Sequence, residues 1–161
     1  MARGGIKTEI LIEAAAWKTA WPRLRIDIRA LAKALAASEA FSGGEGGGQF
    51  VVVLADDRRL HDLNKRFRGK DKPTNVLSFP DAEAPFGGIA LSLETIKREA
   101  REQGKPLINH SKHMILHGFL HLLGHDHQRA RDARLMEGLE TAILASMSIP
   151  DPYQAKGRPR A

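Results

Sequence analysis

The chain has 161 residues, 42% hydrophobic and 27% charged, which suits one soluble globular domain with its own core. It contains no cysteine, so disulfides, thiolate-bound metals and a thiol nucleophile are excluded. The net charge of +6 is compatible with a polyanionic partner such as RNA. No stretch approaches the roughly 20 apolar residues of a membrane span, and no export signal opens the chain. We therefore expect a cytoplasmic protein without membrane contact.

The first third of the chain predicts two strands separated by an amphipathic helix. Residues 8–13 alternate in polarity and residues 50–55 form a β-branched run, so both segments predict strands. A helix is predicted over 23–38 because apolar residues recur there at helical spacing. These residues are Leu24, Ile28, Leu31 and Leu35. The glycine-rich segment 42–48 predicts a flexible loop.

The middle of the chain predicts a capped helix, two further strands and a polar helix. Asp56 is suited to cap a helix that ends at Gly69. The apolar face of this helix consists of Leu60, Leu63 and Phe67. After a basic turn, strands are predicted over 75–79 and 87–93, and a polar helix over 94–103.

The last third predicts two helices and a tail. Residues 107–123 are apolar around much of a helix, which we therefore expect to be buried and to stop at Gly124. A final helix is marked by Leu135, Leu139, Ile143 and Met147. Segment 148–161 is basic and rich in proline, so we expect one domain over 1–147 and a disordered or loosely held tail.

The order of these elements predicts the fold class. About four short strands and about five helices occur without strict alternation of strand and helix. This is typical of an α+β fold with mixed α/β character, in which a small four-stranded sheet packs against helices.

Six of the seven histidines lie between residues 110 and 127. Four of them step by three, four and four and therefore line one side of the predicted helix. They are His110, His113, His117 and His121. Neighbours one turn apart can share a metal ion, whereas residues two turns apart are separated by about 12 Å and cannot. His113 lies two turns from His121, so we expect it in the core or behind a ligand.

The glycine after the helix brings further histidines toward its last turn. Gly124 can reverse the chain, so that His117, His121 and one of His125 or His127 converge. Three imidazoles with one open position are the arrangement of catalytic zinc. The alternative, a set of buried and hydrogen-bonded histidines, is better suited to a lone histidine than to HxxxH followed by HxH.

Position 118 argues against a peptidase. The metalloprotease motif HExxH carries a glutamate at its second position as general base, and here that position is Gly118. We expect the glycine to permit a close approach to the metal instead.

Two ordered motifs resemble those of the YbeY family, bacterial endoribonucleases of ribosomal RNA maturation. HGFLHLLGHDH (117–127) is similar to the histidine motif of the family, and LNKRFRGKDKPTNVLSFP (63–80) is similar to a second family motif. With GGIALS and LMEGLE, the likeness spans 50–144. The resemblance implies a small sheet packed with helices and a metal ion in a groove.

The resemblance also implies a ligand set and a function. It implies one Zn²⁺ per chain on His117, His121 and His127, which selects His127 over His125, and it assigns the key arginine of the family to Arg68. The implied activity is cleavage of single-stranded RNA in late 16S 3′-end maturation and ribosome quality control. The implied partners are precursor ribosomal RNA and the small ribosomal subunit, and we expect a monomer.

Three positions depart from the family pattern. Gly88 stands where the family usually has an aspartate, Phe67 where tyrosine is common, and His125 in place of a frequent tyrosine. None of these positions is one of the three implied ligands.

The residue types suggest how the chemistry would proceed. Zinc on neutral histidines activates water and polarises a phosphoryl oxygen, while Arg68 stabilises the negative charge of the transition state. We expect His117 and His121 to be catalytic through the metal and Asp126 to orient a ligand from behind.

A basic stretch precedes the third predicted strand. Its cations are Lys65, Arg66, Arg68, Lys70 and Lys72. They predict contacts with a phosphate backbone, although a solvated helix face is the alternative. Aromatic residues make up only 6% of the chain, so extensive base stacking is not expected.

Two other functions remain open from the residues alone. One is a ribosome-associated assembly factor whose zinc is mainly structural and which has little intrinsic cleavage. The other is a zinc hydrolase of a peptide or nucleotide, which Gly118 and the basic stretch disfavour.

Overall fold

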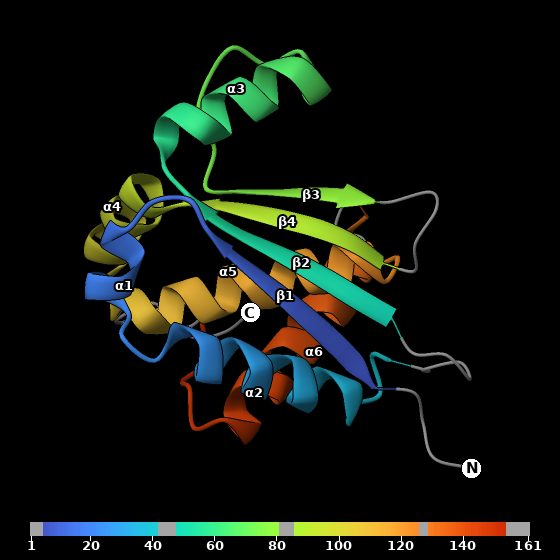
Figure 1. The fold of residues 1–161 in the computed structure, drawn as a ribbon. Coiled ribbons are helices and arrows are strands. Elements are labelled where there is room, and N and C mark those ends of the chain that lie inside the picture. The colour runs from blue at the N-terminus through green and yellow to red at the C-terminus, as the bar shows by residue number, and fades with distance from the viewer. Residues whose placement is uncertain (1–4, 42–47, 81–85, 126–128, 154–161) are drawn as a thin grey trace.

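The computed structural model describes residues 5–41, 48–80, 86–125 and 129–153, which form a mixed sheet with helices on both faces (Figure 1). The strands lie in the order β1-β2-β4-β3. Their bounds are β1 Ile6–Ile12, β2 Gly48–Ala55, β3 Val76–Pro80 and β4 Phe86–Ser92. β1, β2 and β4 run parallel, while β3 pairs antiparallel with β4. β3 therefore forms one edge of the sheet.

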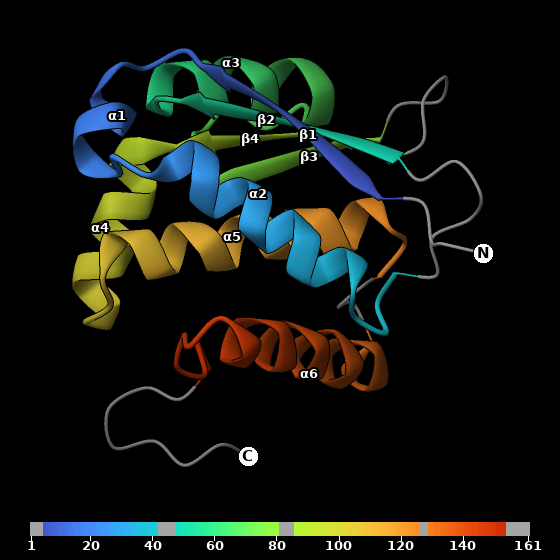
Figure 2. The same cartoon turned by 60° about the horizontal axis from the view of Figure 1, so that its bottom comes forward.

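The helices form unequal layers on the two faces of the sheet. α3 (Asp57–Arg68) covers one face, whereas α2 (Leu24–Ala36) and α5 (Leu107–Leu122) cover the other, with α6 (Ala130–Ser146) beyond them (Figure 2). The main core lies on the α5 side. The α3 side holds a small cluster of Ala55, Leu60, Leu77 and Ala90. The α5 side is thus the firmly packed half of the molecule.

α5 is the central helix of the packed half. It contacts β3, β4, α2, α4 (Leu93–Gln103) and α6, as its apolar circumference predicts. Phe119 stacks on Phe50 of β2 with a centroid distance of 4.0 Å. After the helix, Gly124 has φ 97° and the His125 N–H donates to the Leu120 carbonyl, so the predicted chain reversal is present.

The four predicted strands and five predicted helices are confirmed, and their stated bounds agree within two residues. The last helix begins at Ala130, five residues before Leu135, the first residue that marked it. The sequence analysis does not predict α1 (Ala16–Ala20), because one helical turn is too short to show a period. Its Trp17 is fully buried, and the indole N–H donates to the Ala55 carbonyl at 2.8 Å. None of the described helices is both long and apolar enough to cross a membrane.

The predicted tail begins too early. Ile149 is buried in the core, and the Lys105 ammonium donates to the Pro152 carbonyl. The Tyr153 hydroxyl donates to the carboxylate of Glu140. The segment 148–153 is short and lacks a period, so its anchoring by single side chains is not visible in the sequence. The packed domain therefore extends at least to Tyr153, and 154–161 lies outside the described residues.

Candidate metal centre

The predicted row of histidines is present along α5. Ring centroids are 6.4 Å apart for His110 and His113, 6.4 Å for His113 and His117, and 4.6 Å for His117 and His121. The spacing narrows toward the C-terminal end of the helix. Only the last pair brings two ring nitrogens together, since the Nε2 atoms of His117 and His121 lie 3.1 Å apart.

This pair fits a shared metal ion. Two imidazoles on a tetrahedral zinc, each about 2.0–2.1 Å from it, hold their nitrogens roughly 3.3 Å apart. The observed 3.1 Å is close to that separation. The helix spacing of four residues thus places two imidazoles where they could share a metal ion with little rearrangement of the backbone.

A buried carboxylate sets the orientation of His117. Glu140 of α6 is fully buried, and its Oε1 lies 2.7 Å from Nδ1 of His117. Because a carboxylate only accepts hydrogen bonds, Nδ1 carries the proton and donates it. The lone pair of His117 then resides on Nε2, the atom that faces His121. A carboxylate behind a histidine in this way is the usual support of a zinc ligand.

The second oxygen of Glu140 is held equally firmly. His113 donates through Nε2 to Oε2 of Glu140 at 2.7 Å, and the Tyr153 hydroxyl donates to the same oxygen. Burial lowers the pKa of His113, so its imidazole is neutral. The pKa of Glu140 is raised by burial but lowered more strongly by the hydrogen bonds from His113, His117 and Tyr153, and it falls to about 2. His113 is itself buried on α5 and shares Glu140 with His117.

Sequence reasoning missed Glu140, although a signal was present. The apolar stripe of α6 is formed by Met136, Leu139, Ile143 and Leu144, and Glu140 falls on the same helical face. A charged residue in an apolar stripe requires buried partners. The pattern therefore pointed to a polar group beneath the histidine row.

The remaining predicted ligand and its neighbour, His127 and Asp126, lie outside the described residues. His125, the alternative ligand, places Nε2 3.4 Å from the carbonyl oxygen of Ala40, in the segment after α2. Within the described part of the chain there is no cluster of three or more His, Asp or Glu residues with metal-binding geometry. The described part of the centre is thus the pair His117 and His121 with Glu140 behind it.

The expectation for Gly118 requires a correction. A Cβ atom at this position would lie 2.7 Å from Cγ2 of Ile89 in β4 and 3.4 Å from Oγ of Ser78 in β3. The glycine therefore admits the sheet, not a metal ligand or substrate, to the backbone of α5. Because position 118 faces the sheet, a glutamate there would not face the histidine pair.

Arg68 is the last residue of α3, which lies on the opposite face of the sheet from α5. It is exposed at the C-terminal end of α3, whereas the histidine pair is on α5 (Figure 1). The five cations of the basic stretch are all exposed, and the buried Asn64 fixes their turn by donating from Nδ2 to the Lys72 carbonyl at 2.8 Å. β3 is packed by both α3 and α5, so this edge strand lies between the helix that carries Arg68 and the helix that carries the histidine pair.

The departure at Gly88 also falls on the α3 side. Its neighbour Ile89 packs into the core with α5, and side chains alternate along a strand, so position 88 faces α3. Gly88 is paired directly with Phe79 of β3. An aspartate at this position would lie beside Phe79 and not beneath the histidines.

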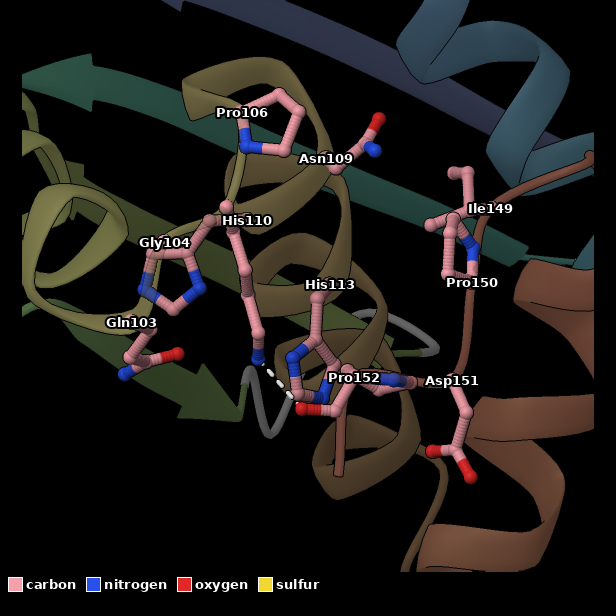
Figure 3. A pocket seen from close by; sticks show the side chains of 11 residues that line it. Gln103, Gly104, Pro106, Asn109, His110, His113, Ile149, Pro150, Asp151 and Pro152 are labelled. Carbon is pink, nitrogen blue, oxygen red and sulfur yellow. Dashed lines mark hydrogen bonds between the residues drawn. The ribbon is translucent and has the colours of Figure 1, made fainter. Parts of the chain in front are cut away.

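A cavity of about 380 Å³ lies toward the opposite end of α5 (Figure 3). His110 and His113 line it, together with the loop around Lys105 and residues 149–152. Neither His117 nor His121 reaches it. The cavity is therefore separate from the histidine pair, although His113 contributes to both surroundings.

Comparisons with known proteins show to which family the chain belongs. A family model described as "Endoribonuclease YbeY" matches residues 12–148. A Rhodopseudomonas palustris protein named Endoribonuclease YbeY is 44% identical over 160 residues, which cover 94% of this chain and 83% of that protein. A Chelativorans protein of the same name is 46% identical over 141 residues, covering 83% of this chain and 86% of that protein.

The fold also has a solved counterpart. The solution structure of TM1509 from Thermotoga maritima superposes with a TM-score of 0.57, covering 95% of this chain and 99% of that one at 22% identity. This likeness confirms the small mixed sheet with its helices. The family match is much longer than the histidine motif and runs from β1 into the segment after α6. The chain therefore belongs to the family described as endoribonuclease YbeY.

Proposed function

We propose that this chain is a zinc-dependent endoribonuclease that cleaves single-stranded RNA. Its relatives carry the name endoribonuclease, and its basic stretch suits a polyanion. The proposed biological role is late 16S 3′-end maturation and ribosome quality control in the cytoplasm. Precursor ribosomal RNA and the small ribosomal subunit are the proposed partners of a monomeric chain.

One observation carries the metal-dependent part of the proposal. The Nε2 atoms of His117 and His121 face one another at 3.1 Å. Glu140 accepts from Nδ1 of His117, which selects the tautomer whose Nε2 can bind a metal ion. Glu140 also accepts from His113, so it is the approach of the two Nε2 atoms that distinguishes His117 and His121 from the other histidines of α5. We assign the third ligand position to His127 and a supporting role to Asp126.

The residues of the chain divide the chemistry among them. A zinc ion bound to three neutral imidazoles supplies a Lewis acid and activates water near neutral pH. Glu140 would hold the His117 ring in orientation, with the proton on Nδ1 and Nε2 directed at the metal. Arg68, always charged and planar, is assigned to the equatorial phosphoryl oxygens that become more negative in the transition state.

The layers of the fold support one path for the proposed RNA. The histidine pair and the basic stretch lie on opposite faces of the sheet, which meet at the free edge of β3. A strand of RNA that crosses this edge contacts both. Lys65, Arg66, Lys70 and Lys72 would bind its phosphates, and this contact is independent of sequence.

A ribosome assembly factor with a mainly structural zinc is the second candidate function. The separation of Arg68 and α5 onto different faces is the observation that favours it, because a structural site needs no arginine beside the metal. Cleavage by the purified chain discriminates between the two functions.

The test is cleavage of a defined single-stranded RNA by the wild-type chain and by His121→Ala and Arg68→Ala, all purified identically. Arg101→Ala is the matched control for charge, since Arg101 is exposed on α4. Zinc content is measured on the same samples. We expect His121→Ala to lose both zinc and cleavage, and Arg68→Ala to lose cleavage but keep zinc.

The two functions give different results. Equal cleavage by all variants would reveal a contaminating nuclease and refute the enzymatic proposal. Zinc in the wild-type chain with no cleavage above background would favour the assembly factor. Cleavage that persists in zinc-free protein would exclude the metal mechanism.

A further inference from the structure

Phe67 is exposed at the end of α3 in a way that packing does not explain. It is the most exposed of the large hydrophobic residues that the structure describes, with 65% of its surface open. The apolar face of α3 begins with Leu60, which is fully buried, and ends with Phe67, beyond the small cluster on this side. The last residue of the predicted apolar face therefore reaches past the core into solvent.

The ring of Phe67 is nevertheless held in place. Phe79 of β3 meets it edge to face, with centroids 5.4 Å apart and an interplanar angle of 70°. Gly88 of β4 is paired directly with Phe79. Because Gly88 has no side chain, this position of β4 places no side chain next to the Phe79 ring. We call Phe67 and Phe79 the aromatic ledge. An aromatic ring that is exposed yet oriented loses little entropy when a flat partner binds.

The charges around the aromatic ledge select the partner. Arg66 and Arg68 flank Phe67 in sequence, and Lys70 and Lys72 follow in the turn. Arg66 pairs with Asp62 at 3.5 Å. Within the described residues, Arg68, Lys70 and Lys72 have no carboxylate within 4.0 Å, which leaves their charges available. A ring surrounded by available cations suits a partner that combines flat faces with negative charge.

We infer that Phe67 stacks against one base of a single-stranded RNA while the neighbouring cations bind its phosphates. This inference rests on the proposed function and adds a base contact to it. Stacking on a phenyl ring tolerates any base, because every base has a π-face. Only an unpaired base can offer that face, so the aromatic ledge would favour single strands over duplexes. A protein surface that docks here instead would bind without dependence on bases.

The test is a double-mutant cycle between Phe67 and the bases. Binding of a short oligoadenylate and of a fully abasic strand of the same length is measured for wild type and Phe67→Leu. The leucine keeps an apolar contact with Phe79 but has no π-face. We expect Phe67→Leu to weaken binding of oligoadenylate roughly 5- to 100-fold and to leave the abasic strand unaffected.

Two controls separate stacking from charge and from misfolding. Lys70→Ala should weaken both strands equally and reduce the salt dependence of binding by about one phosphate contact, whereas Phe67→Leu leaves the salt dependence unchanged. Phe67→Trp should bind oligoadenylate at least as well as wild type, in contrast to Phe67→Leu, and it adds a fluorescent probe. Trp17 and Trp21 are fully buried, so the indole introduced by Phe67→Trp is the one that iodide reaches and that bases quench.

The outcomes distinguish this inference from the proposed function. Equal weakening of both strands by Phe67→Leu, or none, would overturn stacking while wild-type cleavage and binding leave the proposed function intact. Wild-type protein that neither binds nor cleaves single strands would overturn both. Quenching of the exposed indole fluorescence of the Phe67→Trp variant by oligoadenylate, but not by the abasic strand, would support stacking directly.

Discussion

Replacement of Glu140 by glutamine should weaken the metal centre and the fold together. The amide cannot accept hydrogen bonds at both ends, so either His117 or His113 loses its acceptor. The loss of a carboxylate behind a zinc ligand typically reduces metal affinity by about 10- to 100-fold. We expect that range for Glu140→Gln, measured by competition with a chromophoric chelator.

The stability part of this prediction has a magnitude and a sign. The pKa of Glu140 falls from 4.5 to about 2 in the fold, which corresponds to about 3 kcal/mol at about 1.4 kcal/mol for each pH unit. Because the pKa is lowered, this contribution is complete above pH 4.5 and is lost as the pH falls toward 2. Glu140→Gln should therefore lower the free energy of unfolding by up to about 3 kcal/mol near pH 7 and by much less near pH 3.

The measurement is urea unfolding of metal-free wild-type and variant protein across this pH range. Glu102→Gln, an exposed residue of α4, is the matched control and should match wild type throughout. A constant difference between wild type and Glu140→Gln at all pH values would refute the electrostatic argument. Unchanged zinc affinity would refute the role of Glu140 behind His117.

The remaining predictions concern packing, turn geometry and the arginine. Gly118→Ala should lower the melting temperature, because the added Cβ would lie 2.7 Å from Cγ2 of Ile89. This overpacking costs about 1–3 kcal/mol and outweighs the gain in helix propensity of about 1 kcal/mol. Gly138→Ala on α6 is the control and should raise the melting temperature, because its Cβ would meet nothing within 4 Å. Asn64→Ala should weaken RNA binding without loss of zinc, because the basic turn loses its 2.8 Å anchor to the Lys72 carbonyl; an unchanged affinity in anisotropy titrations would contradict this. Arg68→Ala should reduce kcat more than it raises KM in steady-state cleavage, and an effect on KM alone would assign Arg68 to phosphate binding.

The order of elements was predictable because each long element carries its own period. α2, α3 and α5 each show an apolar face in sequence, and the strands show alternation or β-branched runs. The sheet order was not predictable, since it depends on contacts between distant segments such as the pairing of β2 with β4. α1 was missed for a related reason, as Trp17 is fixed by a tertiary hydrogen bond and not by a local pattern.

In the candidate site, too, residues fixed by local spacing were predictable and residues brought in by tertiary contacts were not. The pair His117 and His121 follows from helix geometry and from Gly124, because four residues make about one turn and the glycine reverses the chain beside the last turn. Glu140 comes from another helix, 23 residues further along the chain, so spacing within the motif could not reveal it. The role of Gly118 was misassigned because the sequence shows that space is needed but not whether the sheet or a ligand fills it.

The anchoring of Tyr153 has a practical consequence for anyone who shortens this chain. The sequence suggests that the protein can safely end after Met147, at the close of the last helix. Such a chain would lose the Ile149 side chain from the core and the hydroxyl that holds the second oxygen of Glu140. A truncation chosen to remove a loose end would thus disturb the histidine pair indirectly, because Tyr153 holds Glu140 and Glu140 holds His117.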